Sequence, residues 1–200
     1  MADRENIAVI GLGYVGLPLL VALARYHNVT GLDTNAHRIA ELYDNVDRTG
    51  EVDSRELTSI TMSLTDNPTG IRGKDIYIVT VPTPVDDSLQ PDLTAICEAS
   101  EALGRNLGRG AIVVYESTVY PGVTEDICGP ILEKASGLKC GRDFFLGYSP
   151  ERANPGDRNH TIEQINKVVA GQTDEVARRL AELYGSINGG NVFVAANIRT

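Results

Sequence analysis

A glycine-rich turn directly after a short apolar run constrains this chain more than any other feature. Residues 7–10 read IAVI, which is typical of a strand buried on both faces of a parallel sheet. Residues 11–16 read GLGYVG, a Gly-x-Gly-x-x-Gly pattern at the start of a helical stretch. An acidic residue, Asp33, follows 20 positions after Gly13. This combination predicts a βαβ unit that binds a dinucleotide.

Each glycine of the turn has its own expected role. We expect Gly11 to allow the tight turn, Gly13 to let the backbone approach a pyrophosphate, and Gly16 to let the helix pack against the strand. The free N–H groups and the dipole at the helix N-terminus favour an anion there. Two alternatives to a site for NAD are a glycine turn with a purely structural role and a site for FAD or another adenosine ligand.

The residue after the second predicted strand bears on the choice of cofactor. Asp33 can accept hydrogen bonds from both ribose hydroxyls of an adenosine, whereas a 2′-phosphate there would face a carboxylate. NAD is therefore expected rather than NADP. Arg38 leaves three alternatives open, because its guanidinium could serve a 2′-phosphate, lie over the adenine or pair with Asp33.

The rest of the chain continues the alternation of strands and helices. Predicted strands cover residues 7–10, 29–32, 62–64, 75–81, 111–115, 144–148, 168–170 and 192–194. Predicted helices cover residues 14–26, 35–43, 54–60, 93–107, 122–135 and 173–184. Such alternation with short connections predicts an α/β fold of the Rossmann type, a doubly wound parallel sheet in a single domain over residues 1–200. The polar stretch 149–164 is long for a connection and is expected to be a functional loop.

Composition narrows the classes of partner. With 200 residues, 42% of them hydrophobic, the chain can build one sizeable core. A net charge of −9 and scattered basic residues argue against nucleic acid and anionic membranes as partners. Without a targeting or membrane-spanning segment, the expected location is the cytoplasm. Cys97, Cys128 and Cys140 lack metal-ligand spacing, so reduced thiols and no metal site are expected.

Three further motifs follow predicted strands and point to a family. They are residues 81–85 (VPTPV), 115–122 (YESTVYPG) and 147–157 (GYSPERANPGD). Together with residues 11–19 (GLGYVGLPL), they resemble the UDP-glucose/GDP-mannose dehydrogenase family over essentially the whole chain, most closely its UDP-N-acetylhexosamine 6-dehydrogenase branch. The resemblance implies oxidation of a UDP-sugar C6 hydroxyl to a carboxylate by two NAD, through an aldehyde and a cysteine thioester, in surface polysaccharide synthesis. Pro155 stands where UDP-glucose enzymes commonly carry a second glutamate, which argues against UDP-glucose and leaves GlcNAc, GalNAc and ManNAc open.

The resemblance also implies roles for individual residues. Thr83 and Thr118 would line the nicotinamide side of the cofactor pocket, and Thr118 would help to position water. Glu151 would assist hydrolysis of the thioester, which agrees with the ability of a carboxylate to relay a proton. The alternatives are a surface ion pair of Glu151 with Arg152 or Arg158, and a helix cap at Thr118.

The expected site thus has two parts. The candidate catalytic residues are Thr118 and Glu151, and Glu116 is expected to be structural rather than catalytic. The candidate cofactor-binding residues are Gly11, Gly13, Tyr14, Val15, Gly16, Asp33, Arg38, Thr83, Pro84 and Thr118.

The family's remaining machinery has no counterpart in these 200 residues. Beyond this point the family has a central helix with a lysine and an asparagine that act on the sugar, a nucleophilic cysteine in a glycine-rich motif, and a UDP-binding domain. We therefore expect an NAD-binding domain that is inactive by itself and that belongs to a homodimeric enzyme. An NAD-dependent β-hydroxyacid-type dehydrogenase domain and a non-catalytic NAD-sensing module are the alternatives.

Overall fold

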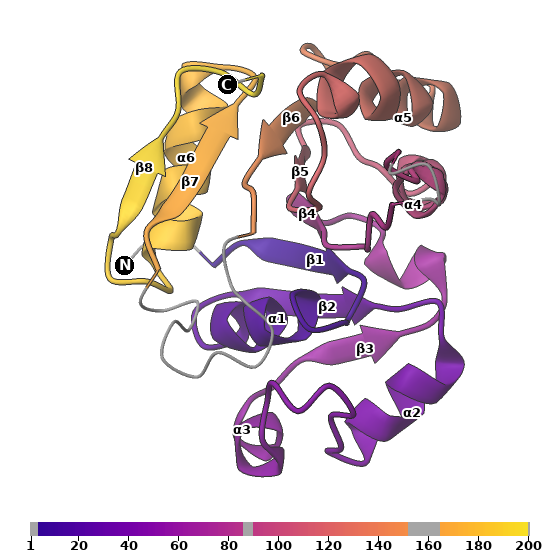
Figure 1. The fold of residues 1–200 in the computed structure, drawn as a ribbon, viewed down its shortest axis with the longest axis vertical. Coiled ribbons are helices and arrows are strands. Elements are labelled where there is room, and N and C mark those ends of the chain that lie inside the picture. The colour runs from indigo at the N-terminus through magenta and orange to yellow at the C-terminus, as the bar shows by residue number, and fades with distance from the viewer. Residues whose placement is uncertain (1–3, 86–89, 152–164, 200) are drawn as a thin grey trace.

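One mixed sheet organises the computed structural model, which describes residues 4–85, 90–151 and 165–199 (Figure 1). The order of its described strands is β3-β2-β1-β4-β5-β6-β7-β8. Their bounds are β1 (Asn6–Ile10), β2 (Asn28–Leu32), β3 (Ser63–Thr65), β4 (Ile76–Val79), β5 (Ile112–Tyr115), β6 (Phe145–Tyr148), β7 (Lys167–Gly171) and β8 (Val192–Val194). The strands from β3 to β6 in this order are parallel to one another.

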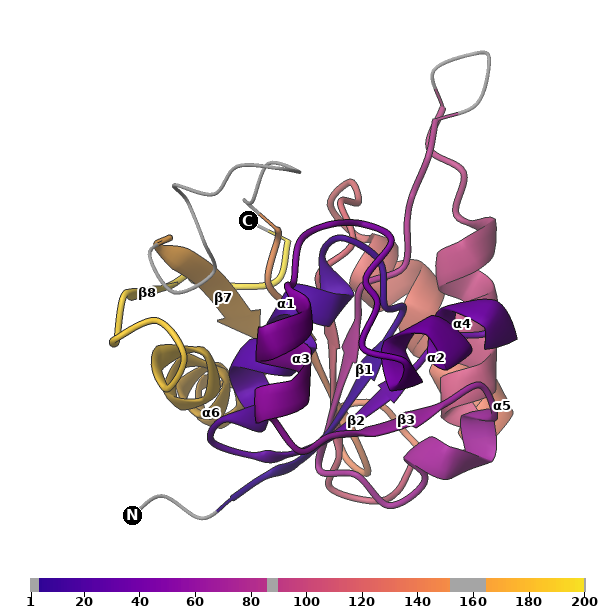
Figure 2. The same cartoon turned by 90° about the horizontal axis from the view of Figure 1, so that it is seen from below.

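Helices cover both faces of this sheet. They are α1 (Gly16–Ala24), α2 (Ala36–Tyr43), α3 (Ser54–Ser59), the 3₁₀ helix η1 (Pro68–Ile71), α4 (Thr94–Gly104), the π-helix η2 (Val123–Cys128), α5 (Gly129–Ser136) and α6 (Asp174–Gly185). Figure 2 shows α1, α3 and α6 on one side of the strands and α4 and α5 on the other. Each set packs its apolar side chains into its own core cluster. The expected doubly wound Rossmann-type fold is confirmed.

The apolar runs of the sequence have a direct structural reason. In β4, Ile76 and Ile78 pack into one core cluster, whereas Tyr77 and Val79 pack into the other. All four side chains are fully buried. Because successive side chains of a strand point to opposite faces, a strand covered by helices on both faces must be apolar throughout.

The position of β1 creates a crevice at one edge of the sheet. β1 pairs with β2 on one side and with β4 on the other, so the chain changes direction across the sheet at this point. In open α/β sheets, ligands bind at such a switch point, beyond the carboxyl ends of the strands. The glycine turn leaves the carboxyl end of β1 into this crevice.

One strand, β7, departs from the expected parallel sheet. This strand is antiparallel to β6, with Gly147 opposite Gly171 and Tyr148 opposite Ala170. The register places the end of β7 beside the carboxyl end of β6, so the start of β7 extends beyond that end. The consequence is that Lys167, the first residue of β7, lies at the edge of the sheet where ligands bind.

The helix expected over residues 122–135 is also interrupted. The structure has the π-helix η2 first, in which the Gly129 N–H donates to the carbonyl of Thr124, and then α5. Pro130 has no N–H, so it cannot make the α-helical hydrogen bond to residue 126, and the helix changes its pattern there. Within the described ranges, no helix has both the length and the apolar character needed to cross a membrane.

Candidate cofactor-binding site

The backbone of the glycine turn leaves little room for larger residues at two of its three glycines. Gly11 has a φ of +93°, in the region that favours glycine, and its N–H donates to the carbonyl of Leu32 at 2.8 Å. A Cβ on Gly16 would lie 1.8 Å from the carbonyl oxygen of Gly11. A Cβ on Gly13, by contrast, would meet no atom within 4 Å. Gly13 is therefore the glycine that faces open space.

Three side chains hold this turn in place. Thr80 Oγ1, just after β4, donates to the carbonyl of Gly11 at 2.7 Å. Asp33 Oδ2 accepts from the N–H of Leu12 at 2.9 Å, and Arg38 Nε donates to the carbonyl of Leu12 at 2.8 Å. The turn is thus preorganised by protein contacts. Thr80 was not among the expected residues, because a single threonine after a strand carries no sequence signal.

The N-terminus of α1 is suited to an anion. Val15 at the N-cap provides no side-chain hydrogen bond, and the first turn of the helix holds no acidic residue. The first N–H groups of a helix have no partner within it, and its dipole favours negative charge at that end. These groups, together with the open space at Gly13, fit a pyrophosphate.

The turn forms part of a cavity of about 440 Å³ at the carboxyl edge of the sheet. The cavity fits the binding of a dinucleotide, because it joins the turn and Asp33 to the loops after β4, β5 and β6. All of the candidate residues except Gly16 and Arg38 line it. The lining residues are Gly11, Gly13, Tyr14, Val15, Asp33, Thr80, Val81, Pro82, Thr83, Pro84, Glu116, Ser117, Thr118 and Glu151.

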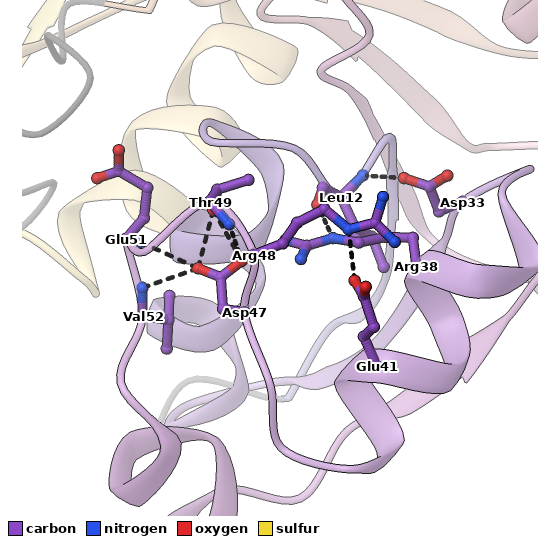
Figure 3. A network of polar contacts seen from close by, with 9 residues as sticks. All are labelled: Leu12, Asp33, Arg38, Glu41, Asp47, Arg48, Thr49, Glu51 and Val52. Atoms are coloured by element: carbon purple, nitrogen blue, oxygen red, sulfur yellow. Dashed lines mark hydrogen bonds and ion pairs between the residues drawn. The ribbon is translucent and has the colours of Figure 1, made fainter.

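Arg38 has a supporting position behind the turn. Its side chain is buried, and its guanidinium pairs with Asp47 at 2.7 Å as well as with the Leu12 carbonyl (Figure 3). The alternative in which Arg38 pairs with Asp33 is wrong, because the Asp33 carboxylate accepts instead from the backbone N–H groups of Leu12 and Asn35.

Asp47 is the buried counter-charge of Arg38. Burial would raise the pKa of the Asp47 carboxyl, but hydrogen bonds from Thr49, Val52 and Arg38 together lower it below its usual value. The Asp47 side chain has no exposed surface. The loop before α3 is therefore tied through one ion pair to the glycine turn.

Thr118 and Thr83 connect two loops of the pocket wall. Thr118 is exposed, and its carbonyl accepts a hydrogen bond from Thr83 Oγ1 at 2.7 Å. The alternative in which Thr118 caps the next helix is wrong, because that helix begins at Val123 with Gly122 at its N-cap. Thr118 is therefore available to the pocket.

Glu151 pairs with a lysine that the sequence did not single out. Lys167 Nζ lies 3.0 Å from Glu151 Oε2. The two arginines considered as surface partners, Arg152 and Arg158, lie outside the described residues, as does most of the expected functional loop. Lys167 carried no signal, since an isolated lysine before an apolar run reads as the polar start of a strand.

Glu116 is buried on the far side of the same lysine. Its Oε2 accepts from Lys167 Nζ at 2.7 Å, and its Oε1 accepts from the hydroxyl of Tyr184. Burial raises the pKa of Glu116 to about 7; the attraction of Lys167 opposes this rise and the charge of Glu151 adds to it. Burial would lower the pKa of Lys167, but the two carboxylates raise it.

The raised pKa of Glu116 makes stability depend on pH. The unfolded carboxyl titrates near 4.5 and the folded one near 7. Between these values the folded state binds more protons, so the free energy of unfolding is expected to fall as pH rises from about 4.5 to about 7, by at most about 3 kcal/mol. Urea unfolding of wild type and Glu116→Gln at several pH values measures this loss. The variant should show a flatter dependence, and equal slopes would contradict the assignment.

Comparisons with known proteins agree with this geometry. A match to the UDP-glucose/GDP-mannose dehydrogenase family, NAD binding domain, extends over residues 5–188. Protein CapL from Staphylococcus aureus is 51% identical over 98% of the chain and 46% of its own length. The UDP-N-acetyl-D-glucosamine 6-dehydrogenase of Pseudomonas aeruginosa is 50% identical over 97% of the chain and 46% of its own length.

A solved structure extends the likeness to three dimensions. The UDP-D-ManNAc dehydrogenase of Pyrococcus horikoshii superposes with a TM-score of 0.88 at 30% identity, over 96% of this chain and 47% of that one. The chain thus spans about half the length of the relatives that it matches. Motifs, fold and comparisons lead to one conclusion: the chain belongs to the UDP-glucose/GDP-mannose dehydrogenase family and matches its NAD-binding domain.

Proposed function

We propose that this chain is the cofactor-binding part of an NAD-dependent UDP-N-acetylhexosamine 6-dehydrogenase that serves surface polysaccharide synthesis. The observation that carries the proposal is a single pocket lined by the dinucleotide turn and Asp33 together with Thr118 and Glu151. A binding module that only senses NAD would not need Thr118 and Glu151 in the same pocket. The family match favours this reading over a β-hydroxyacid-type dehydrogenase.

Each group in the pocket has a defined task in this proposal. When NAD is bound, it supplies the acceptor for the hydride of the sugar. The turn and the N-terminus of α1 hold the pyrophosphate, and Asp33 holds the adenosine ribose. Thr83 and Thr118 orient the nicotinamide end, and Thr118 also positions water. Glu151 would act as a general base that takes a proton from that water as its oxygen bonds to the thioester carbon, and then as a general acid that gives the proton to the sulfur when the C–S bond breaks.

We place the remaining catalytic groups in the half of the relatives' length that this chain does not match. Those groups are the nucleophilic cysteine, the base for the C6 hydroxyl and the UDP-binding domain. Assembly as a homodimer and location in the cytoplasm are parts of the same proposal. The relative named for UDP-GlcNAc is 50% identical and the structure named for UDP-D-ManNAc is 30% identical, which favours the glucosamine epimer.

The activity is tested with the complete gene product that carries this sequence. With UDP-GlcNAc and saturating NAD, we expect two NADH per sugar consumed and a uronic acid product, measured by absorbance and mass spectrometry. UDP-glucose should be a much poorer substrate, and the 200-residue chain alone should give no sustained NADH. A complete product that binds NAD but oxidises none of the UDP-N-acetylhexosamines would refute the proposed substrate class.

The preference for NAD is tested at Asp33. Calorimetric titration of the chain is expected to give tighter binding of NAD than of NADP. Asp33→Asn keeps the shape of the side chain but removes its charge, so it should weaken NAD binding by about tenfold to a hundredfold and narrow the preference. Equal or tighter binding of NADP by the wild-type chain would contradict the role of Asp33.

A further inference from the structure

A buried ammonium group joins two carboxylates next to the pocket. Lys167 Nζ lies 2.7 Å from Glu116 Oε2 and 3.0 Å from Glu151 Oε2. The exposed fractions of the three side chains are 1% for Lys167, 0% for Glu116 and 10% for Glu151. These residues come from the start of β7 and from the ends of β5 and β6. Three strand ends are thus tied together through one nitrogen atom.

The contacts around Lys167 divide into two sets. In the first set, Glu116 binds both Lys167 and the hydroxyl of Tyr184, and the centroid of the Tyr184 ring lies 5.4 Å from the ammonium. Glu116 is held from two sides in this way, by the ammonium and by the hydroxyl of Tyr184. The second set is Glu151 alone, whose carboxylate meets the same ammonium from the loop after β6.

The position of Glu151 suggests what its ion pair does. Glu151 and Glu116 both line the pocket, whereas Lys167 does not line it. Ser149 Oγ donates to the carbonyl of Val168 at 2.8 Å, which fixes the end of β6 to β7 next to this ion pair. A carboxylate held by a buried, immobile ammonium keeps one orientation, and a reacting group misplaced by 1 Å can lose about a hundredfold in rate.

We propose that Lys167 is a positioning residue that holds the Glu151 carboxylate in the pocket, with Glu116 and Tyr184 fixing the ammonium. Lys167 lies beside Glu116 and Glu151 because β7 runs antiparallel to β6. The inference rests on the proposed function, because it requires that Glu151 acts in catalysis. It adds a residue whose contribution is made through Glu151 and not by contact with cofactor or sugar.

The complete enzyme allows a test by substitution. Lys167→Met is expected to lower kcat about a hundredfold and to leave the KM for NAD unchanged, since Lys167 does not line the pocket. This variant also leaves two buried carboxylates without their cation, so it should be less stable. Lys139→Met is the control, because Lys139 is an exposed lysine in an ion pair with Glu133; it should keep wild-type kcat.

A double variant separates positioning from neutralisation. Lys167→Met combined with Glu116→Gln removes the cation and one carboxylate, so much of the lost thermal stability should return. If Lys167 positions Glu151, kcat stays low in this stable protein. If kcat returns together with stability, Lys167 only balances the charge of Glu116 and the proposal is overturned.

The inference and the proposed function fail in different ways. Wild-type kcat in Glu151→Gln would remove the role on which Lys167 depends, even if the chain binds NAD normally. Loss of the proposed function would show instead as an absence of NAD binding in calorimetry, or as an absence of UDP-sugar oxidation by the wild-type enzyme. The inference is supported by one result. The wild-type enzyme binds NAD and oxidises the sugar normally, and kcat is low in both the single and the double variant at position 167.

Discussion

Gly13→Val is expected to abolish binding of NAD while the sheet stays folded. The position lines the pocket, and a Cβ there would meet no protein atom within 4 Å, so the fold has room for a side chain. The same space is where the pyrophosphate must approach the backbone. The affinity should fall by more than about a hundredfold, which is about 3 kcal/mol. Calorimetry and circular dichroism on the same sample measure binding and folding together.

Two other glycines are matched controls for this result. Gly108 also faces open space but does not line the pocket, so Gly108→Val should bind NAD normally. At Gly16 a Cβ would lie 1.8 Å from the Gly11 carbonyl oxygen and 2.4 Å from Thr80 Oγ1, so Gly16→Val should lose stability and binding together. If Gly13→Val retains its affinity, the phosphates do not lie at this turn.

The fold was predictable because its strands are buried on both faces. The predicted strand 75–81 contains the continuous apolar run 76–79, and the structure places β4 on this run with four fully buried side chains. Loops that follow parallel strands meet at one edge of the sheet. For this reason Asp33, Thr83, Thr118 and Glu151, which lie far apart in the sequence, could be expected in one pocket, and all four line it.

The ion pairs behind the pocket could not be predicted in this way. Lys167 is 51 residues from Glu116 and 16 residues from Glu151, and its burial depends on β7 running antiparallel to β6. An apolar run indicates a strand but not its direction. The role of Arg38 likewise stayed open, because the loop that contains Asp47 has no regular sequence pattern from which this ion pair could be predicted. The supporting contacts are long-range, whereas the sequence signals are local.

The ion pair of Arg38 leads to a large expected loss of stability. Arg38→Met should lower the free energy of unfolding by about 3–5 kcal/mol, because it leaves the carboxylate of Asp47 buried without its cation. It also removes the donor to the Leu12 carbonyl, so the turn should bind NAD more weakly. Chemical unfolding measures the first effect and calorimetry the second. Adding Asp47→Asn removes the unpaired charge, so the double variant should regain part of the stability but not the affinity.

Arg48 provides the matched control for Arg38 within the same small region. It pairs with Glu41 on the surface, and Figure 3 shows both ion pairs side by side. The Arg48 side chain is 47% exposed and that of Arg38 is 5% exposed. Water and salt screen an exposed pair, so Arg48→Met should change stability very little. The decisive comparison is therefore between two arginines of equal charge. If both substitutions lower the free energy of unfolding by the same amount, burial of the Arg38–Asp47 pair is not what fixes the loop. The proposed link between this loop and the glycine turn is then wrong as well.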